Sequence, residues 1–157
     1  MKVKVIQPEA PAAWYAEGLK FTCTQCGNCC TGGPGYVWLQ GDELHKIAQY
    51  LNADMAEILH RYCRPLDGRV SLKENKNSNG EYDCVFLTSQ GGRRICGIYS
   101  VRPLQCRTWP FWDGNLAGPK MWENTAEKCP GIGSGKHYSQ SHVEKIRDAR
   151  RCDEVEI

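Results

Sequence analysis

Residues 23–30 read Cys-Thr-Gln-Cys-Gly-Asn-Cys-Cys and place four thiols within eight positions. The two-residue gaps let successive sulfurs face one centre while the intervening backbone N–H groups donate to them, and Gly27 can adopt the positive φ that such a turn often needs. Neighbouring side chains diverge in helix and strand, so Cys29 and Cys30 are not expected to serve one tetrahedral ion equivalently. One of them is expected to ligate a second centre, as the last cysteine of the bacterial ferredoxin motif does.

Four more cysteines stand farther along the chain in turn-rich sequence. With the first four they make eight thiols, the number that two four-cysteine sites require, whether those sites hold zinc ions or iron–sulfur clusters. The predicted metal ligands are Cys23, Cys26, Cys29, Cys30, Cys84, Cys96, Cys106 and Cys129. The other two cysteines, Cys63 and Cys152, belong to no motif, and we expect them to be buried or free thiols.

Basic residues outnumber acidic residues by six to three between Cys84 and Cys129. A cationic frame stabilises thiolates. Arg102 and Arg107 are therefore expected to support the bound cofactor through hydrogen bonds to sulfur. Two alternatives stay open, because these arginines could belong to an ordinary solvated surface, and Arg102 could pair with a carboxylate such as Asp83.

The composition indicates one small domain that is held together by metal. The chain has 157 residues, a size typical of one domain, and we expect residues 1–157 to form a single unit. Only 29 residues are Leu, Ile, Val or Phe, close to the level at which chains bury too little apolar surface to fold. The ten cysteines are expected to supply the missing stability by binding metal, with a disulfide framework as the less favoured alternative.

The hydropathy, net charge and motifs of the sequence argue against several classes of function. The N-terminal sequence has no apolar export signal, and no apolar run approaches the roughly 18 residues needed to cross a bilayer, so we expect a cytoplasmic protein without a membrane partner. A net charge of +2 without a basic stripe argues against nucleic acid as a ligand. No hydrolase triad, carboxylate pair or nucleotide fingerprint can be assembled, so catalysis stays open only through the metal.

An irregular α+β fold is expected around the cysteines, with a few helices and short strands. Apolar residues recur at helical spacing over Leu44–Leu51, and Asp54 with Glu57 forms a capping box ahead of a second helix. A third helix is expected at about residues 141–152, capped by Ser141 and closing the domain as a lid.

Strands are expected on either side of a polar stretch at residues 73–80. This stretch is rich in turn formers and separates Val70–Leu72 from Tyr82–Leu87, which predicts two strands joined by a loop and paired with each other. Residues 91–135 are expected to be mostly irregular because Gly, Pro and Trp are frequent there. Within that segment, the aromatic run at residues 109–112 is expected to pack in the core, with a docking face for a redox partner as the alternative.

Two weaker signals lie near Cys129. The glycine-rich stretch Gly131–Gly135 resembles a phosphate loop, but it lacks a preceding buried strand and the Walker lysine spacing, so a flexible loop is expected. His137 is the one histidine that we consider as a non-cysteine ligand. Surface positions are expected for the other three histidines, His45, His60 and His142.

Four blocks in order carry a resemblance to a known family. They are the CTQCGNCC head, CVFL at Cys84, CGIYSVRPLQCRTWPFW from Cys96, and CPGIGSG at Cys129. From about residue 21 to residue 135 the chain resembles the YkgJ-like cysteine-cluster family, described as a zinc- or iron-chelating CxxCxxCC domain. The resemblance implies chelation of zinc or iron by these cysteines, and it implies no particular substrate or reaction.

The spacing favours iron–sulfur clusters, one or two and of the four-iron type, because a three-cysteine run with a vicinal fourth resembles cluster ligation. A protein of this kind would serve electron transfer or metal-dependent chemistry with a redox partner protein. Structural zinc is the rival, because a thin aliphatic core also suits a fold held by metal-binding free energy. Metal storage or trafficking is a third possibility, for which exchangeable ligands would be expected.

Overall fold

The two helices predicted in the first half of the chain begin and end close to expectation in the computed structural model, which describes residues 11–151. Helix α1 (Glu43–Leu51) ends at Asn52, whose left-handed backbone lets its N–H reach the last carbonyls of the helix. Helix α2 (Met55–Tyr62) begins after Asp54, whose carboxylate accepts a 2.7 Å hydrogen bond from the N–H of Glu57. The capping signal therefore set the start of α2 as predicted.

Ten short strands form four small antiparallel sheets in the described part of the chain. The sheet orders are β1-β10, β2-β7-β6, β3-β5-β4 and β8-β9. The strand bounds are β1 (Leu19–Phe21), β2 (Thr31–Gly32), β3 (Trp38–Leu39), β4 (Cys63–Leu66), β5 (Arg69–Leu72), β6 (Glu74–Lys76), β7 (Tyr82–Cys84), β8 (Leu87–Gln90), β9 (Arg93–Cys96) and β10 (Ile132–Tyr138). Together with six α-helices they make a small cysteine-rich α+β domain, which confirms the predicted fold class.

The predicted partnership of the two strands around residues 73–80 was wrong. Strand β5 pairs with β3 and β4, whereas β7 pairs with β2 and β6. The polar stretch itself contains β6, so that the connecting turn is confined to residues 77–81. Polar residues pair well at a sheet edge, and alternation within one short strand does not say which distant strand will satisfy its backbone groups.

The expectation of irregular structure at residues 91–135 was also wrong. The segment holds β9, the single-turn helices α3 (Leu104–Arg107) and α4 (Asp113–Leu116), the longer α5 (Pro119–Lys128) and the start of β10. Helix α5 buries only Trp122 and Thr125, so it carries no aliphatic repeat that would have revealed it. The glycine-rich stretch is likewise part of β10 and is not a free loop.

The last helix, α6 (Gln140–Arg151), matches the predicted lid helix in place, but its cap differs. The Ser139 hydroxyl accepts a hydrogen bond from the His142 N–H at 3.4 Å, while Ser141 is exposed. Val143 is fully buried and anchors α6 to the domain. None of the helices among residues 11–151 has the length and apolar character needed to cross a membrane.

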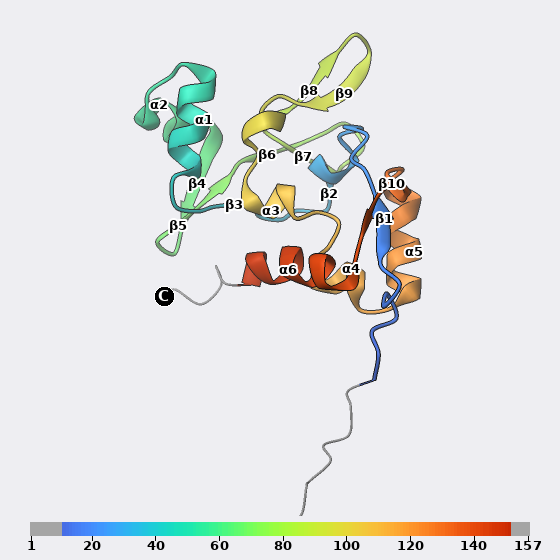
Figure 1. Ribbon diagram of the computed structural model, residues 1–157. Helices are drawn as coiled ribbons and strands as arrows, with labels where there is room; N and C mark the ends of the chain where they lie inside the picture. The colour runs from blue at the N-terminus through green and yellow to red at the C-terminus, as the bar shows by residue number, and fades with distance from the viewer. Residues whose placement is uncertain (1–10, 152–157) are drawn as a thin grey trace, which may run out of the picture.

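Two separate apolar cores flank the cysteine-rich head of the chain (Figure 1). The first core lies among β1, β10, α4, α5 and α6 and is rich in aromatic side chains, which offset the shortage of aliphatic residues. Its buried members are Tyr15, Leu19, Phe21, Phe111, Leu116, Trp122, Cys129 and Val143. The second core lies under α1 and α2, and its buried members are Ile47, Ala48, Ile58, Cys63, Leu72, Phe86 and Ile98.

Candidate metal centre

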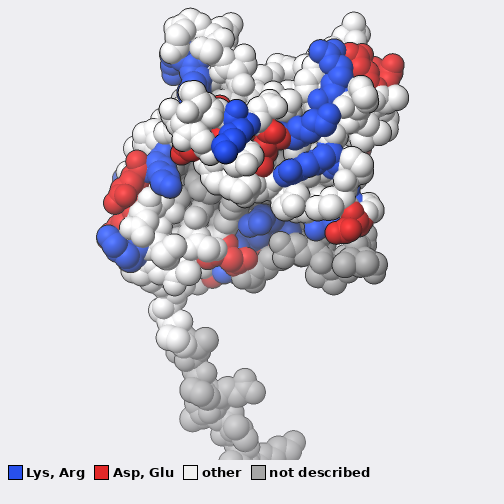
Figure 2. Space-filling model, turned by 180° about the vertical axis from the view of Figure 1, so that it is seen from behind, with Lys and Arg blue, Asp and Glu red and all other residues white. Residues whose placement is uncertain are grey.

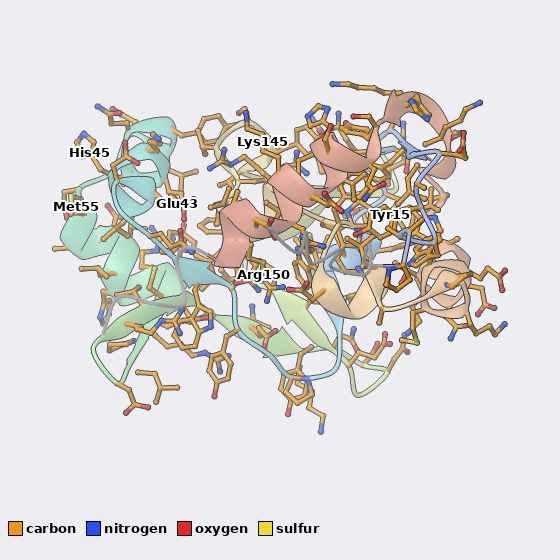
Figure 3. The ribbon with its side chains drawn as sticks, turned by 60° about the horizontal axis from the view of Figure 1, so that its bottom comes forward. Tyr15, Glu43, His45, Met55, Lys145 and Arg150 are labelled. Atoms are coloured by element: carbon orange, nitrogen blue, oxygen red, sulfur yellow. The ribbon has the colours of Figure 1, made fainter. Side chains whose placement is uncertain are left out.

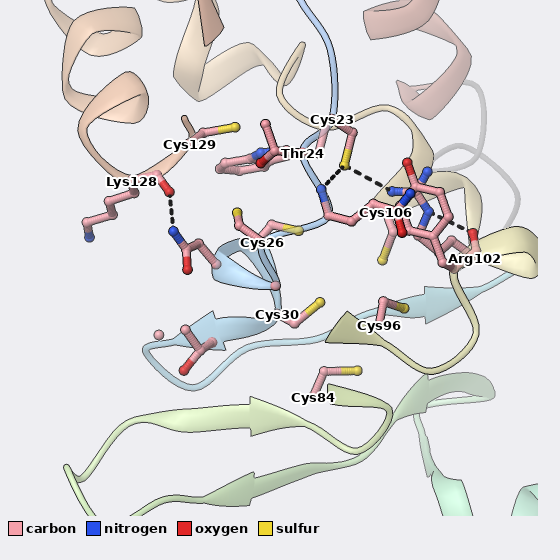
Figure 4. A pocket seen from close by; sticks show the side chains of 18 of the residues that line it. Cys23, Thr24, Cys26, Cys30, Cys84, Cys96, Arg102, Cys106, Lys128 and Cys129 are labelled. Atoms are coloured by element: carbon pink, nitrogen blue, oxygen red, sulfur yellow. Dashed lines mark hydrogen bonds between the residues drawn. The ribbon is translucent and has the colours of Figure 1, made fainter. Parts of the chain in front are cut away.

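All eight cysteines predicted as ligands line one cavity of about 320 Å³. The cavity lies where the head loop, the ends of β7 and β9, helix α3 and the end of α5 meet, and in Figure 4 the labelled thiols surround a common space. Its cysteines are Cys23, Cys26, Cys29, Cys30, Cys84, Cys96, Cys106 and Cys129. Of the remaining two, Cys63 is buried in the second core, and Cys152 lies outside the described residues.

Two residues with left-handed backbone and a short turn shape the head loop, which presents four thiols. Gln25 and Gly27 have positive φ values of 56° and 73°, and a short 3-10 turn, η1 (Asn28–Cys30), follows. A side chain at Gly27 would also meet a methyl carbon of Leu87 at 2.8 Å. The expected role of Gly27 in the turn is therefore confirmed by its conformation.

Two hydrogen bonds hold the head loop against the end of α5. The side-chain amide of Asn28 donates to the Lys128 carbonyl at 2.9 Å, and the N–H of Thr22 donates to the Gly131 carbonyl at 3.1 Å. Gly131 lies so close to Thr22 that a Cβ there would overlap its carbonyl oxygen. These contacts bring Cys129, at the end of α5, to the same cavity as the head cysteines.

On the side of the cavity opposite Cys129, the pairing of β2 with β7 places the thiols of Cys30 and Cys84. Thr31 lies opposite Asp83 in the β2–β7 pair, so the cysteines adjoining them in sequence, Cys30 and Cys84, reach the same region. The Thr31 hydroxyl donates to the Asp83 carboxylate, which lowers the pKa of that carboxyl. Cys96 ends β9, and its thiol lies against that of Cys30.

Cys106 is placed by α3, which two buried polar side chains attach to the rest of the domain. Glu43 accepts the Leu104 N–H at 2.6 Å, and Gln105 accepts the Trp38 N–H at 3.1 Å and donates to the Tyr36 carbonyl at 2.7 Å. Figure 3 shows Glu43 on α1 pointing toward the body of the domain. The helix turn that carries Cys106 is therefore tied to α1 and β3.

A repeated backbone motif supplies hydrogen bonds to sulfur. Cys23, Cys84, Cys96 and Cys129 each accept from the backbone N–H two residues later, in the first case from Gln25 at 3.4 Å. Such N–H donors stabilise thiolates and tune metal–thiolate centres. The three other donor residues are Phe86, Ile98 and Gly131.

Arg102 is the cavity cation that reaches a cysteine sulfur. Its guanidinium reaches the Cys23 sulfur at 4.0 Å, while its Nε donates to the Tyr99 carbonyl at 2.9 Å and its plane covers the Tyr99 ring at 3.6 Å. Asp83, which the sequence offered as another partner for Arg102, instead accepts hydrogen bonds from the side chains of Thr31 and Asn77. Arg102 therefore faces sulfur and not that carboxylate.

Other residues singled out in the sequence lie away from the cavity. Arg107 donates to the Arg102 carbonyl at 3.0 Å and approaches Glu43 at 3.4 Å, and it is absent from the cavity lining. The ring of His137 bonds the Glu17 carbonyl at 2.8 Å instead of facing a thiol. His45, His60 and His142 are exposed, as expected.

Burial and thiol contacts divide the cysteines into two electrostatic types. Contact with the Cys30 thiol lowers the pKa of Cys29 and of Cys96 to about 7 each, and Arg102 adds to both effects. The same contacts raise the pKa of Cys30. Burial raises the pKa of Cys84 to about 11 and also raises that of Cys106. Thiolate and thiol thus lie side by side, as is expected where several sulfurs share one site.

Aromatic side chains form part of the wall that the sequence did not assign to the site. Trp109 and Trp112 line the cavity, and Trp109 also packs against the first core, in which Phe111 is buried. The expected core packing therefore holds for Trp109 and Phe111. Tyr99 hydrogen-bonds Cys23, and Trp109 hydrogen-bonds Cys129. Only the closeness of these residues to cysteines in the sequence could have indicated this role.

The donor set of the cavity consists of sulfur. Within residues 11–151, no three Cys, His, Asp or Glu side chains converge tightly enough to hold a single ion as they stand. The eight thiols instead surround a cavity with apolar walls and N–H donors to sulfur. Thiolates with such donors are the ligands of iron–sulfur clusters and also of zinc.

Comparison with known proteins supports metal chelation. A family model for CxxCxxCC proteins, described as "Putative zinc- or iron-chelating domain", matches residues 22–130, which include all eight cavity cysteines. An uncharacterized protein of Methanocaldococcus jannaschii is 36% identical over 97 residues, which make up 62% of this chain and 48% of that protein. The chain thus spans about half the length of this curated relative. No solved structure matches the chain.

Proposed function

The chain belongs to the CxxCxxCC family of zinc- or iron-chelating domains, and from that premise we propose that its eight cavity cysteines bind iron–sulfur clusters of the four-iron type for electron transfer. The observation that carries the proposal is the lining of one cavity by eight thiols, four of which accept backbone N–H groups. Bound clusters would supply one-electron redox chemistry.

The residues around the thiols support a redox role. Arg102 lies against Cys23 and offsets the negative charge that a set of thiolates gathers. Trp109, Trp112 and Tyr99 reduce the access of water, which together with hydrogen bonding tunes the potential of such a centre. Cys29 is exposed at the surface, so electrons would enter or leave at the head loop.

A redox partner protein belongs to this proposal. It would dock over the exposed head loop, where Cys29 brings the site to the surface. Basic side chains occur as separate groups on the face in Figure 2, with acidic ones among them. Contact over the loop itself is therefore a better basis for partner recognition than long-range charge.

The decisive experiment measures iron, zinc and acid-labile sulfide in protein purified without oxygen, together with its visible and electron paramagnetic resonance spectra. Iron with matching sulfide, and a brown colour that dithionite bleaches, is the expected result. The matched control is Cys63→Ser, which alters a buried thiol outside the cavity and should leave metal content unchanged. Colourless protein with zinc and no sulfide would replace this function with a structural zinc module, and zinc that exchanges rapidly with a chelator would indicate storage or trafficking.

A further inference from the structure

Two neighbouring cavities lie between α3 and α6, apart from the cysteine cavity. Their volumes are about 650 and 350 Å³. The first is lined by residues of α3, the residue that follows it, and α6, whereas β3 and β5 complete the wall of the second. The linings adjoin, because Gln105 and Arg150 of the second cavity are next in sequence to Leu104 and Ala149 of the first. We call the two together the α3–α6 crevice.

The α3–α6 crevice is basic. Besides His142, its lining carries the cations Arg69, Arg107, Lys145 and Arg150, and it includes no Asp or Glu side chain from residues 11–151. Glu43 approaches Arg107 at 3.4 Å and offsets part of its charge. No carboxylate in the described part of the chain forms an ion pair with the other three. Figure 3 shows two of them, Lys145 and Arg150, on α6.

Two of the arginines lie over tryptophan rings. The guanidinium carbon of Arg69 is 4.1 Å from the centre of the Trp38 ring, and that of Arg150 is 4.4 Å from the centre of the Trp112 ring. Trp38 is itself stacked on Tyr36, with 4.9 Å between the ring centres. Stacking orients a guanidinium and leaves its N–H groups open to bidentate pairing with a carboxylate. Trp112 also lines the cysteine cavity, so the crevice adjoins the wall of the candidate metal centre.

Apolar side chains lie between the two ends of the crevice. Leu104 and Ile146 line it and are only partly buried. Along α6 the lining extends from Ser141 to Arg150, a length of about 14 Å at the helical rise per residue. Four or five residues of extended chain span the same length at about 3.3 Å each. The matching ligand is therefore an extended chain that combines spaced negative charges with apolar side chains.

We propose that the α3–α6 crevice binds an acidic peptide segment of a partner protein. Carboxylates of that segment pair with Arg69, Lys145 and Arg150, and its apolar side chains pack on Leu104 and Ile146. This docking surface is separate from the head loop. It goes beyond the proposed function and does not depend on which metal the cysteines bind.

The test measures the binding of a short, fluorescein-labelled random copolymer of glutamate and tyrosine to the metal-loaded protein by fluorescence anisotropy. A random copolymer presents many acidic sequences, so the result does not depend on the choice of one. We expect saturable binding that weakens as the salt concentration rises. Arg69→Gln and Arg150→Gln should each bind about tenfold more weakly, the usual scale for losing a hydrogen bond to a charged group.

The matched control is Arg93→Gln, which changes an exposed arginine of β9 outside the crevice lining. This variant should bind the copolymer as the unmutated protein does, and circular dichroism should show the same fold for all three variants. Absence of saturable binding, or equal weakening in Arg93→Gln, would overturn the proposal.

Two other occupants of the crevice would give different results. If single-stranded polyuridylate binds more tightly and displaces the copolymer, the crevice is a nucleic-acid site and the proposal fails. The proposal also fails if the copolymer binds only to a chain that ends at Arg151, because the crevice then belongs to residues 152–157, which read Cys-Asp-Glu-Val-Glu-Ile. The substitutions leave all eight cavity cysteines in place, so that metal and sulfide analysis tests the proposed function separately.

Discussion

Arg102 is the single residue through which charge acts most directly on the site. Its guanidinium reaches Cys23 and favours the thiolate forms of Cys29 and Cys96. Stacking on Tyr99 and the bond to the Tyr99 carbonyl hold it in that direction. A fixed cation beside sulfur favours the more negative, reduced state of a bound cluster.

Replacing Arg102 with Gln should therefore lower the reduction potential of the site. We expect a shift of about 60 mV, which is a tenfold change in the equilibrium constant of a one-electron couple. Arg102→Lys should recover part of the potential because it keeps the charge, and Arg107→Gln should change little because Arg107 lies outside the cavity lining. Redox titration followed by visible absorption measures all three, and equal shifts for Arg102→Gln and Arg107→Gln would contradict this role.

The thiols could be foreseen from sequence, whereas their polar and aromatic neighbours could not. The spacing of residues 23–30 is local, and local turns bring such cysteines together with little help from the rest of the fold. Tyr99 and Trp109 meet Cys23 and Cys129 only after distant segments have packed. Arg107 follows Cys106 in sequence, but its side chain donates to the Arg102 carbonyl and lies outside the cavity lining, so its role toward the cofactor stays a prediction.

At the scale of elements, short helices and strands depend on a few buried polar anchors. Helix α3 has one turn and no side-chain cap of its own. The Glu43 carboxylate accepts the Leu104 N–H at the start of this helix. It also accepts hydrogen bonds from the Gln40 N–H and from the Arg107 guanidinium. A buried carboxylate that satisfies two backbone donors is costly to remove, because both donors lose their partner.

Replacing Glu43 with Ala should destabilise the folded protein by about 2 kcal/mol, the usual scale for leaving buried donors unpaired. Urea denaturation of the metal-loaded protein followed by circular dichroism measures the change. Glu123→Ala is the matched control, since Glu123 forms an exposed pair with Lys120 at 3.6 Å, and exposed pairs contribute less than about 1 kcal/mol. Equal effects of the two substitutions would show that Glu43 is not an anchor.

The close contact between Gly131 and Thr22 can be tested by adding a single methyl group at Gly131. In Gly131→Ala the new methyl group would overlap the Thr22 carbonyl and push the end of α5 away from the head loop. We expect a loss of about 1–3 kcal/mol and weaker metal retention in a chelator competition assay. Gly114→Ala, where an added Cβ meets nothing within 4 Å, should retain metal as the unmutated protein does. Full retention by Gly131→Ala would mean that this contact does not position Cys129.

Elements with a strong local signal were predictable, and those with a nonlocal cause were not. Asp54 and the apolar repeat of α1 act within a few residues, so both helices were found. Strand β5 finds its partners in β3 and β4, and β1 finds its partner in β10, more than a hundred residues away. Sequence alternation cannot identify such partners, and α5 has too few buried residues to show a helical period.

For the whole molecule, the cysteine-lined cavity lies between two small cores, so a metal centre bound there would be held by residues of both. Neither core is large, and the cavity thiols are shared between them. Metal binding should therefore contribute to the cooperativity of folding as well as to its free energy.

Removal of metal should thus split unfolding into separate events. With metal bound, tryptophan fluorescence and far-ultraviolet circular dichroism should report one common transition in urea. After anaerobic chelation the two curves should separate, because Trp122, with Trp14 and Trp109 packed on the same core, makes fluorescence report mainly the first core, whereas circular dichroism sums the helices of both cores. Coincident curves in the metal-free protein would show that the cores remain coupled without the centre.

The pairing of β1 with β10 also has a consequence for the order of events during protein synthesis. Leu19 lies opposite Tyr138, so the head cysteines leave the ribosome long before the strand that fixes them on the first core. At bacterial or eukaryotic elongation rates of about 5–20 residues per second, that interval lasts several seconds or longer. During it the head thiols are open to oxidants and to adventitious metal, which makes timely delivery of the correct metal a matter for the cell and not for the sequence alone.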